Sequence, residues 1–206
     1  MKHATTQALY GYWNRLRGSK PAPERSEIEP GDIRTILGDT FILEALGDEG
    51  YRFRLAGTRM CAAYCRELKG RDFLRMWSDK DREAMETMLQ TITNDAAAAV
   101  LGVESRTDRG QSVDLEILLL RMRYQGYARI LGSCAMMEKP YWIGIHPVVS
   151  QSISSLRLIW PDEQPFFLRK VNAGREGHAV APASHLAYRR VGHLTVYEGG
   201  KNQPEA

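Results

Sequence analysis

Apolar and charged residues alternate most regularly over residues 51–56, where a tyrosine, a phenylalanine and a leucine are separated by two arginines. This period of two is typical of a strand with one buried face. Gly57 then interrupts the pattern, and Thr58 offers a hydroxyl N-cap for a short helix that passes through Met60 and Tyr64. The segment therefore predicts a strand that is followed directly by a helix.

Four other segments also have the short period of strands. Residues 41–46 precede 51–56 across the turn-rich tetrapeptide 47–50, which predicts a β-hairpin. A meander of three more strands is predicted near residues 100–107, 112–122 and 127–137. Because two strands, several short helices and three strands follow one another, the predicted fold class is α+β. It has a five-stranded antiparallel sheet with helices on one face.

Apolar residues recur at helical spacing in two places. Leu9, Trp13 and Leu16 predict an amphipathic N-terminal helix over residues 5–17, which needs a partner surface. Prolines in residues 18–31 end this helix and predict a connector. Further along, a serine cap and an acidic first turn precede four apolar residues at helical spacing. These are Met85, Met88, Leu89 and Ile92.

The length of 206 residues, of which 43% are hydrophobic, predicts one domain with appendages. We divide the chain into an N-terminal helix and connector over 1–38, a core over 39–138 and a C-terminal extension over 139–206. The extension is rich in proline, glycine and polar residues, and residues 172–183 have too little to bury to be rigid. Within it, apolar residues near 153–160 can dock on the core, and 193–197 can form a short strand.

Three motifs carry a family resemblance that covers most of the chain. They are the aromatic helix ending in Tyr12–Gly18, the connector Arg25–Pro30 and the segment Phe53–Thr58. Together they resemble the PAS-fold family found as short stand-alone proteins in alphaproteobacteria. The resemblance implies a topology in which the first strand lies beside the last. Where the family usually has a glycine, this chain has Cys65, which argues against a turn with positive φ at that position.

The resemblance also implies an interior, between the sheet and the helices, in which PAS proteins commonly enclose a small molecule. The candidate lining residues are aromatic, thioether or thiol side chains: Phe53, Met60, Tyr64, Trp77, Met88 and Cys134. Such side chains also fill ordinary protein cores, which is the simpler interpretation. Thr58, Arg71 and Ser133 are the candidates for polar contacts to a ligand whose identity is unknown.

Two common cofactors fit the sequence poorly. In flavin-binding photoreceptors of the family, a reactive cysteine closely follows a Gly-Arg pair. Aligning that pair with Gly70 and Arg71 puts Phe73 at the position of the cysteine, so a flavin adduct is not expected. All five histidines lie outside residues 39–138, so haem with a histidine ligand is not expected either. Cys61 and Cys65 lack a second ligand pair, and no metal site is predicted.

Several functional classes lack their signals in this chain. We find no glycine-rich phosphate loop, nucleophile elbow or paired metal ligands, so we do not expect an enzyme. No apolar run is long enough for a membrane helix. The net charge of +3 is spread over interspersed acidic and basic residues, which argues against nucleic-acid binding. Three unevenly placed cysteines fit reduced thiols and a cytoplasmic location.

The sequence leaves no residues for a recognisable output domain. We therefore predict a cytoplasmic PAS-like sensory or regulatory protein that binds a small molecule or a signalling-protein partner and signals through protein contacts. A ligand-free adaptor or dimerisation module with a filled core is the alternative, and an unrecognised enzyme is a third. The apolar stripe of the first helix is the candidate homodimer contact, with packing on the chain's own sheet left open: Leu9, Tyr10, Trp13 and Leu16.

Overall fold

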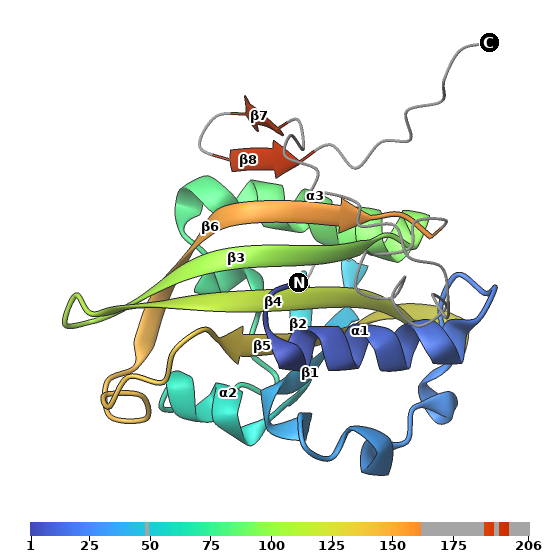
Figure 1. The fold of residues 1–206 in the computed structure, drawn as a ribbon, viewed down its shortest axis with the longest axis horizontal. Helices are drawn as coiled ribbons and strands as arrows, with labels where there is room; N and C mark the ends of the chain where they lie inside the picture. The colour runs from blue at the N-terminus through green and yellow to red at the C-terminus, as the bar shows by residue number, and fades with distance from the viewer. Residues whose placement is uncertain (48–49, 162–187, 192–193, 198–206) are drawn as a thin grey trace, which may run out of the picture.

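The computed structural model describes residues 1–47, 50–161, 188–191 and 194–197. The first half of the chain forms α1 (Ala4–Arg17), the 3-10 helices η1 (Arg25–Glu27), η2 (Pro30–Ile33) and η3 (Leu37–Asp39), strands β1 (Thr40–Ala45) and β2 (Tyr51–Ala56), α2 (Thr58–Ala63), η5 (Leu74–Met76) and α3 (Asp79–Asp95). The remainder forms β3 (Ala98–Thr107), β4 (Ser112–Tyr124), β5 (Tyr127–Met136), β6 (Val148–Ile159), β7 (Tyr188–Val191) and β8 (Leu194–Tyr197). Figure 1 shows these elements arranged around one sheet.

The strands lie in the order β2-β1-β5-β4-β3-β6-β8-β7. All five predicted strands are present, and β1 pairs antiparallel with β5, as the family resemblance implied. The predicted count of five is wrong, however, because β6 pairs antiparallel with β3 along its length. Many side chains of β6 are polar or only half-buried, so its periodicity is weak in the sequence. Part of the assigned extension therefore belongs to the sheet, while residues 172–183, expected to be flexible, lie outside the described residues.

Helices cover both faces of the sheet, which corrects the expectation that they lie on one face. In Figure 1, α1 lies in front of the sheet and α3 behind it. Two separate apolar clusters result. One lies between the sheet and α2, η5 and α3, and we call it the interior cluster. The other joins α1 and the connector to the opposite face, through residues such as Leu118 and Leu120 of β4. Alternating side chains of the same strands supply the two clusters.

The apolar stripe of α1 packs on the chain's own sheet. Leu9, Tyr10 and Trp13 are each at most 2% exposed, and Leu16 is partly buried in the same cluster. The indole Nε1 of Trp13 also donates to the backbone oxygen of Arg121 at 2.7 Å. Of the two alternatives left open by the sequence, the structure therefore has the intramolecular one, and this stripe is not open to a second chain as a homodimer contact.

The turn after α2 contradicts a second expectation. Cys65 has φ 49°, although cysteine argued against positive φ there. Two backbone bonds explain the conformation: the Cys65 N–H donates to the Ala62 oxygen at 3.0 Å, and the Arg66 N–H donates to the Cys61 oxygen at 3.1 Å. This is the Schellman pattern, in which the first residue past the helix is left-handed. The N-cap prediction for α2 is wrong as well. The N-cap residue is Gly57, which makes no side-chain cap hydrogen bond, and Thr58 is the first residue of the helix.

Candidate functional site

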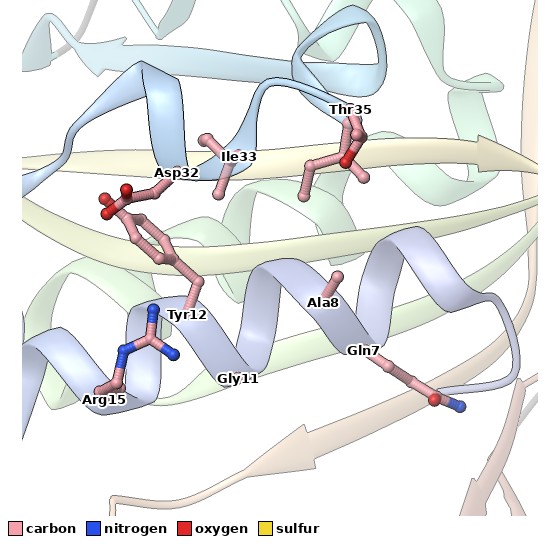
Figure 2. A pocket seen from close by; sticks show the side chains of 9 residues that line it. Gln7, Ala8, Gly11, Tyr12, Arg15, Asp32, Ile33 and Thr35 are labelled. Atoms are coloured by element: carbon pink, nitrogen blue, oxygen red, sulfur yellow. The ribbon is translucent and has the colours of Figure 1, made fainter.

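The surface of the described part of the chain has a cleft of about 290 Å³ between α1 and the connector. Figure 2 shows small residues of α1, Ala8 and Gly11, on one side and Ile33 and Thr35 on the other. A second cleft, of about 470 Å³, lies beside the C-terminal ends of α1 and α3. Neither cleft is lined by any of the six candidate ligand residues, which lie deeper in the molecule.

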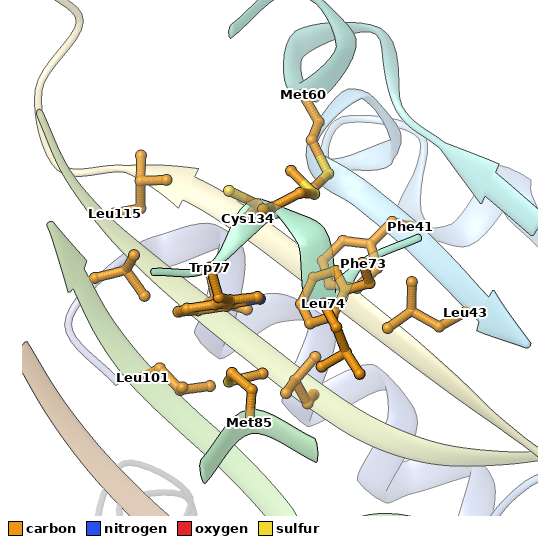
Figure 3. Packing of buried hydrophobic residues seen from close by; sticks show 14 of the residues in the cluster. Phe41, Leu43, Met60, Phe73, Leu74, Trp77, Met85, Leu101, Leu115 and Cys134 are labelled. Carbon is orange, nitrogen blue, oxygen red and sulfur yellow. The ribbon is translucent and has the colours of Figure 1, made fainter. Parts of the chain in front are cut away.

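The structure brings all six predicted ligand residues into the interior cluster. Each is at most 6% exposed, and together they come from β2, α2 and its C-terminal turn, the end of η5, α3 and β5: Phe53, Met60, Tyr64, Trp77, Met88 and Cys134. Figure 3 shows several of them between the sheet and the helices. All six therefore share one buried cluster, in the interior where they were predicted to lie.

Aromatic rings occupy much of this interior. Phe41, Phe53 and Phe73 contact one another with ring centroids 5.5 to 5.8 Å apart, and Phe73 also packs edge-on against Trp77 at 5.8 Å. Centroid separations of this size are those of directly packed rings. Phe73, the residue at the position of the photoreceptor cysteine, is fully buried. The chain's own rings therefore fill the space beside β1 and β2.

A polar group that sequence reasoning missed lies in the same interior. Gln151 of β6 is 1% exposed, and its Nε2 donates to the Tyr64 hydroxyl. Its Oε1 has no partner among the described residues, and neither has the Oγ of Ser105, which lies opposite it on β3. The indole Nε1 of Trp77 is likewise unpaired within the described ranges. Gln151 was missed because residues 148–159 were assigned to the extension.

Burial raises the pKa values of two ionisable groups of the interior. Burial raises the pKa of the Tyr64 hydroxyl well above its ordinary value. Burial, with a smaller contribution from Asp39, raises the pKa of the Cys134 thiol to about 12. Both groups are largely neutral near pH 7 even with their ordinary pKa values, and burial extends this neutral range into alkali because it penalises the charged forms. The Tyr64 and Gln151 pair is therefore an uncharged hydrogen bond in an apolar surrounding.

One carboxylate connects α3 to β6 beside this pair. Asp81 is fully buried in the first turn of α3. It accepts a hydrogen bond from the Ser78 hydroxyl at 2.8 Å and another from the Ile153 N–H of β6 at 3.1 Å. These hydrogen bonds supply donors to the buried side chain, as a buried polar group requires. They also hold α3 at a definite position against the strand that carries Gln151.

The polar residues predicted to contact a ligand lie elsewhere. Thr58 and Arg71 are exposed. Ser133 is buried, but its neighbour Cys134 faces the interior cluster. Because neighbouring strand residues point to opposite faces, Ser133 points to the α1 side of the sheet. None of the three predicted polar contacts is therefore in the interior.

The described residues contain no group of three or more histidine, cysteine or acidic side chains that could hold a metal ion. Among the cysteines, Cys65 is exposed, Cys61 is half-buried and Cys134 is buried. No helix in the described ranges is both long and apolar enough to span a membrane.

The three thiols are expected to differ strongly in reactivity. With a pKa of about 12, only roughly one Cys134 side chain in 10⁴ is a thiolate at pH 8, and burial blocks access. In folded protein at pH 8, a disulfide reagent should label Cys65 first, Cys61 more slowly because burial raises its pKa, and Cys134 only after unfolding. Mass mapping of labelled peptides measures the order. Labelling of Cys134 as fast as Cys65 would contradict the buried placement.

The same pKa predicts a loss of stability in alkali. The folded pKa of Cys134 lies above the ordinary value of 9.0, so the folded state holds this proton more tightly than the unfolded state. Its contribution is fully present below about pH 9 and declines as the pH rises toward 12.

Comparison with known proteins decides the family. A family model described as a PAS domain matches residues 1–135. The chain belongs to the PAS domain family. PAS domains are in general sensory or regulatory, and the match includes α1 as well as the sheet as far as β5. The strand β6, which carries Gln151, lies beyond the matched residues.

Comparison with solved structures adds a more distant likeness. The PAS domain of an HTR-like protein from Haloarcula marismortui is 18% identical, with a TM-score of 0.41, and the match covers 52% of this chain and 90% of that one. No curated protein matched this PAS chain.

Proposed function

We propose that the chain is a cytoplasmic, non-enzymatic regulatory PAS protein that acts through protein contacts and whose interior is a packed core. The ring packing of Phe41, Phe53, Phe73 and Trp77 carries this proposal. Close-packed side chains transmit small displacements, so a partner that contacts one side of this cluster would affect the residues on its other side.

A second candidate function is the sensing of a small polar molecule at the Tyr64 and Gln151 pair. A specific observation favours it: Gln151 Oε1 and Ser105 Oγ, opposite each other on adjacent strands, are buried without partners among the described residues. An unpaired buried polar group costs about 1–3 kcal/mol. A ligand that donates hydrogen bonds to these oxygens would recover part of that cost. The fitting class is a small uncharged molecule with N–H or O–H groups.

Replacing the polar pair separates the two candidates by stability. Tyr64→Phe alone is expected to lower the free energy of unfolding by about 1–3 kcal/mol, because it leaves the buried amide of Gln151 unpaired. The double variant Tyr64→Phe with Gln151→Leu removes both polar partners. If the interior is only a core, its unfolding free energy should return to within about 1 kcal/mol of wild type. Urea unfolding followed by circular dichroism measures both.

Native mass spectrometry of protein purified from the cells that produce it tests the ligand directly. The packed-core proposal expects the mass of the protein alone, before and after denaturation. A small-molecule mass that is lost on denaturation, and is missing from the double variant, would instead establish the second candidate.

A further inference from the structure

The chain covers the β2 edge of its sheet with its own backbone. The Phe53 N–H donates to the Arg71 oxygen at 3.0 Å, and the Phe53 oxygen accepts from the Gly70 N–H at 2.7 Å. The Phe73 N–H also donates to the Tyr51 oxygen at 2.7 Å, and the Phe73 side chain is fully buried. An open strand edge presents unpaired N–H and C=O groups to other chains. At β2 these groups are used within the chain.

The first half of β6 is also covered on the side that faces away from β3. The Ser78 N–H donates to the Gln151 oxygen at 2.8 Å, and the Ile153 N–H donates to the buried carboxylate of Asp81 at 3.1 Å. The start of α3 therefore closes this half of the edge through backbone hydrogen bonds, as the segment around Arg71 does at β2.

The second half of β6, residues 154–159, is covered by the β7–β8 hairpin. In Figure 1, β8 lies alongside β6, and β7 lies outside β8. Leu156 and Val196 form the one pair between β6 and β8 among the described residues, whereas β6 pairs with β3 along its whole length. Structure that is held by few contacts opens locally at a small cost in free energy. This cover is therefore the one that opens most readily.

The strand beneath the hairpin lacks the features that keep an open edge from pairing. Over residues 148–159, Arg157 is the one charged residue, and there is no proline. In contrast, β7 is four residues long, and two of these are arginines. Short strands, charged residues and prolines protect sheet edges from other chains. The hairpin thus replaces an edge that can pair with one that resists pairing.

We propose that the β7–β8 hairpin is a detachable cover, which keeps residues 154–159 of β6 from pairing with the same residues of a second copy of this chain. A second copy fits because a strand edge that pairs antiparallel with itself closes around a two-fold axis. A register that places residue 156 opposite residue 157 keeps the two Arg157 side chains from facing each other. This control goes beyond the proposed function, because it concerns a backbone edge of the sheet and not its interior.

Hydrogen exchange tests whether the hairpin covers this edge. Val196→Pro in the full chain should release the hairpin, because proline removes a backbone donor and does not fit inside a sheet. At a protein concentration of about 1 µM, the backbone amides of residues 154–159 should exchange about tenfold faster than in wild type. The amides of β3, which lie inside the sheet, should exchange at the wild-type rate.

Light scattering tests what the uncovered edge does. At about 100 µM, where association is favoured, the mass of Val196→Pro should approach twice that of wild type. Adding Ser154→Lys should restore the wild-type mass, because a lysine on an open edge opposes pairing. Ser112→Lys is the matched control, since Ser112 is also an exposed strand serine but belongs to β4, inside the sheet. It should leave the mass doubled.

Three results would overturn the proposal. One is faster exchange in Val196→Pro at an unchanged mass, because the uncovered edge would then not pair. Another is unchanged exchange over residues 154–159, because the hairpin would then not cover this edge. The third is a doubled mass that persists with Ser154→Lys as it does with Ser112→Lys, which would place the contact between the copies elsewhere.

Discussion

Replacing Gly57 with alanine is expected to destabilise the protein by about 3 kcal/mol or more, because an added methyl group meets backbone that cannot move aside. A Cβ at position 57 would lie 2.5 Å from the carbonyl carbon of Gly38, and nearer still to the carbonyl oxygens of Leu37 and Gly38. The φ of −70° at Gly57 is accessible to alanine. The expected loss of stability therefore comes from the close contact with the backbone of Leu37 and Gly38, and not from backbone strain at position 57. The free energy of unfolding in urea measures it.

Gly11 provides the control for this variant. It lies within α1, and a Cβ added at this position would have nothing within 4 Å. Gly11→Ala should raise the free energy of unfolding by about 0.5–1 kcal/mol, because alanine loses less backbone entropy in a helix. If Gly57→Ala were as stable as wild type, the placement of η3 against the start of α2 would be wrong.

Trp13→Ala is expected to cost about 3–5 kcal/mol of unfolding free energy, as for other buried tryptophans. Trp13 is 2% exposed, and its indole donates to the Arg121 backbone. The variant therefore loses apolar burial and the hydrogen bond from the indole to the Arg121 backbone oxygen. Because α1 packs on its own sheet, the change should act on stability and leave the mass in solution unaltered. Urea unfolding and light scattering measure the two quantities.

Trp160 is the matched control, since it is the same residue type but 48% exposed. Trp160→Ala should change the free energy of unfolding by less than about 0.5 kcal/mol. A Trp13→Ala protein that kept full stability but fell from dimer to monomer mass would restore the homodimer contact first predicted for the α1 stripe.

Regular local patterns explain which elements could be predicted. The alternation over Tyr51–Ala56 corresponds to β2 at both ends, and the apolar spacing from Met85 to Ile92 lies within α3. Both patterns are strong because one face of each element is buried and the other is solvated. The six interior candidates share a cluster for the same reason, since buried faces of neighbouring elements meet in one core.

The polar part of the site could not be predicted, because its residues come together only through strand pairing. Gln151 is one polar residue in a segment rich in serine, and its burial depends on the pairing of β6 with β3 opposite Ser105. Its hydrogen bond to Tyr64 joins residues 87 positions apart. No local pattern in the sequence indicates a contact between residues so far apart in the chain.

The sequence by itself determined the PAS family, the strands β1 to β5 and the amphipathic character of α1, because local periodicity and short motifs specify these. Only the tertiary structure decided that α1 covers its own sheet, that β6 extends the sheet and that Cys65 adopts positive φ. An amphipathic helix requires an apolar surface to pack against, but its own sequence does not specify which surface that is. That choice, like the placement of Gln151, follows from which surfaces the folded chain brings together.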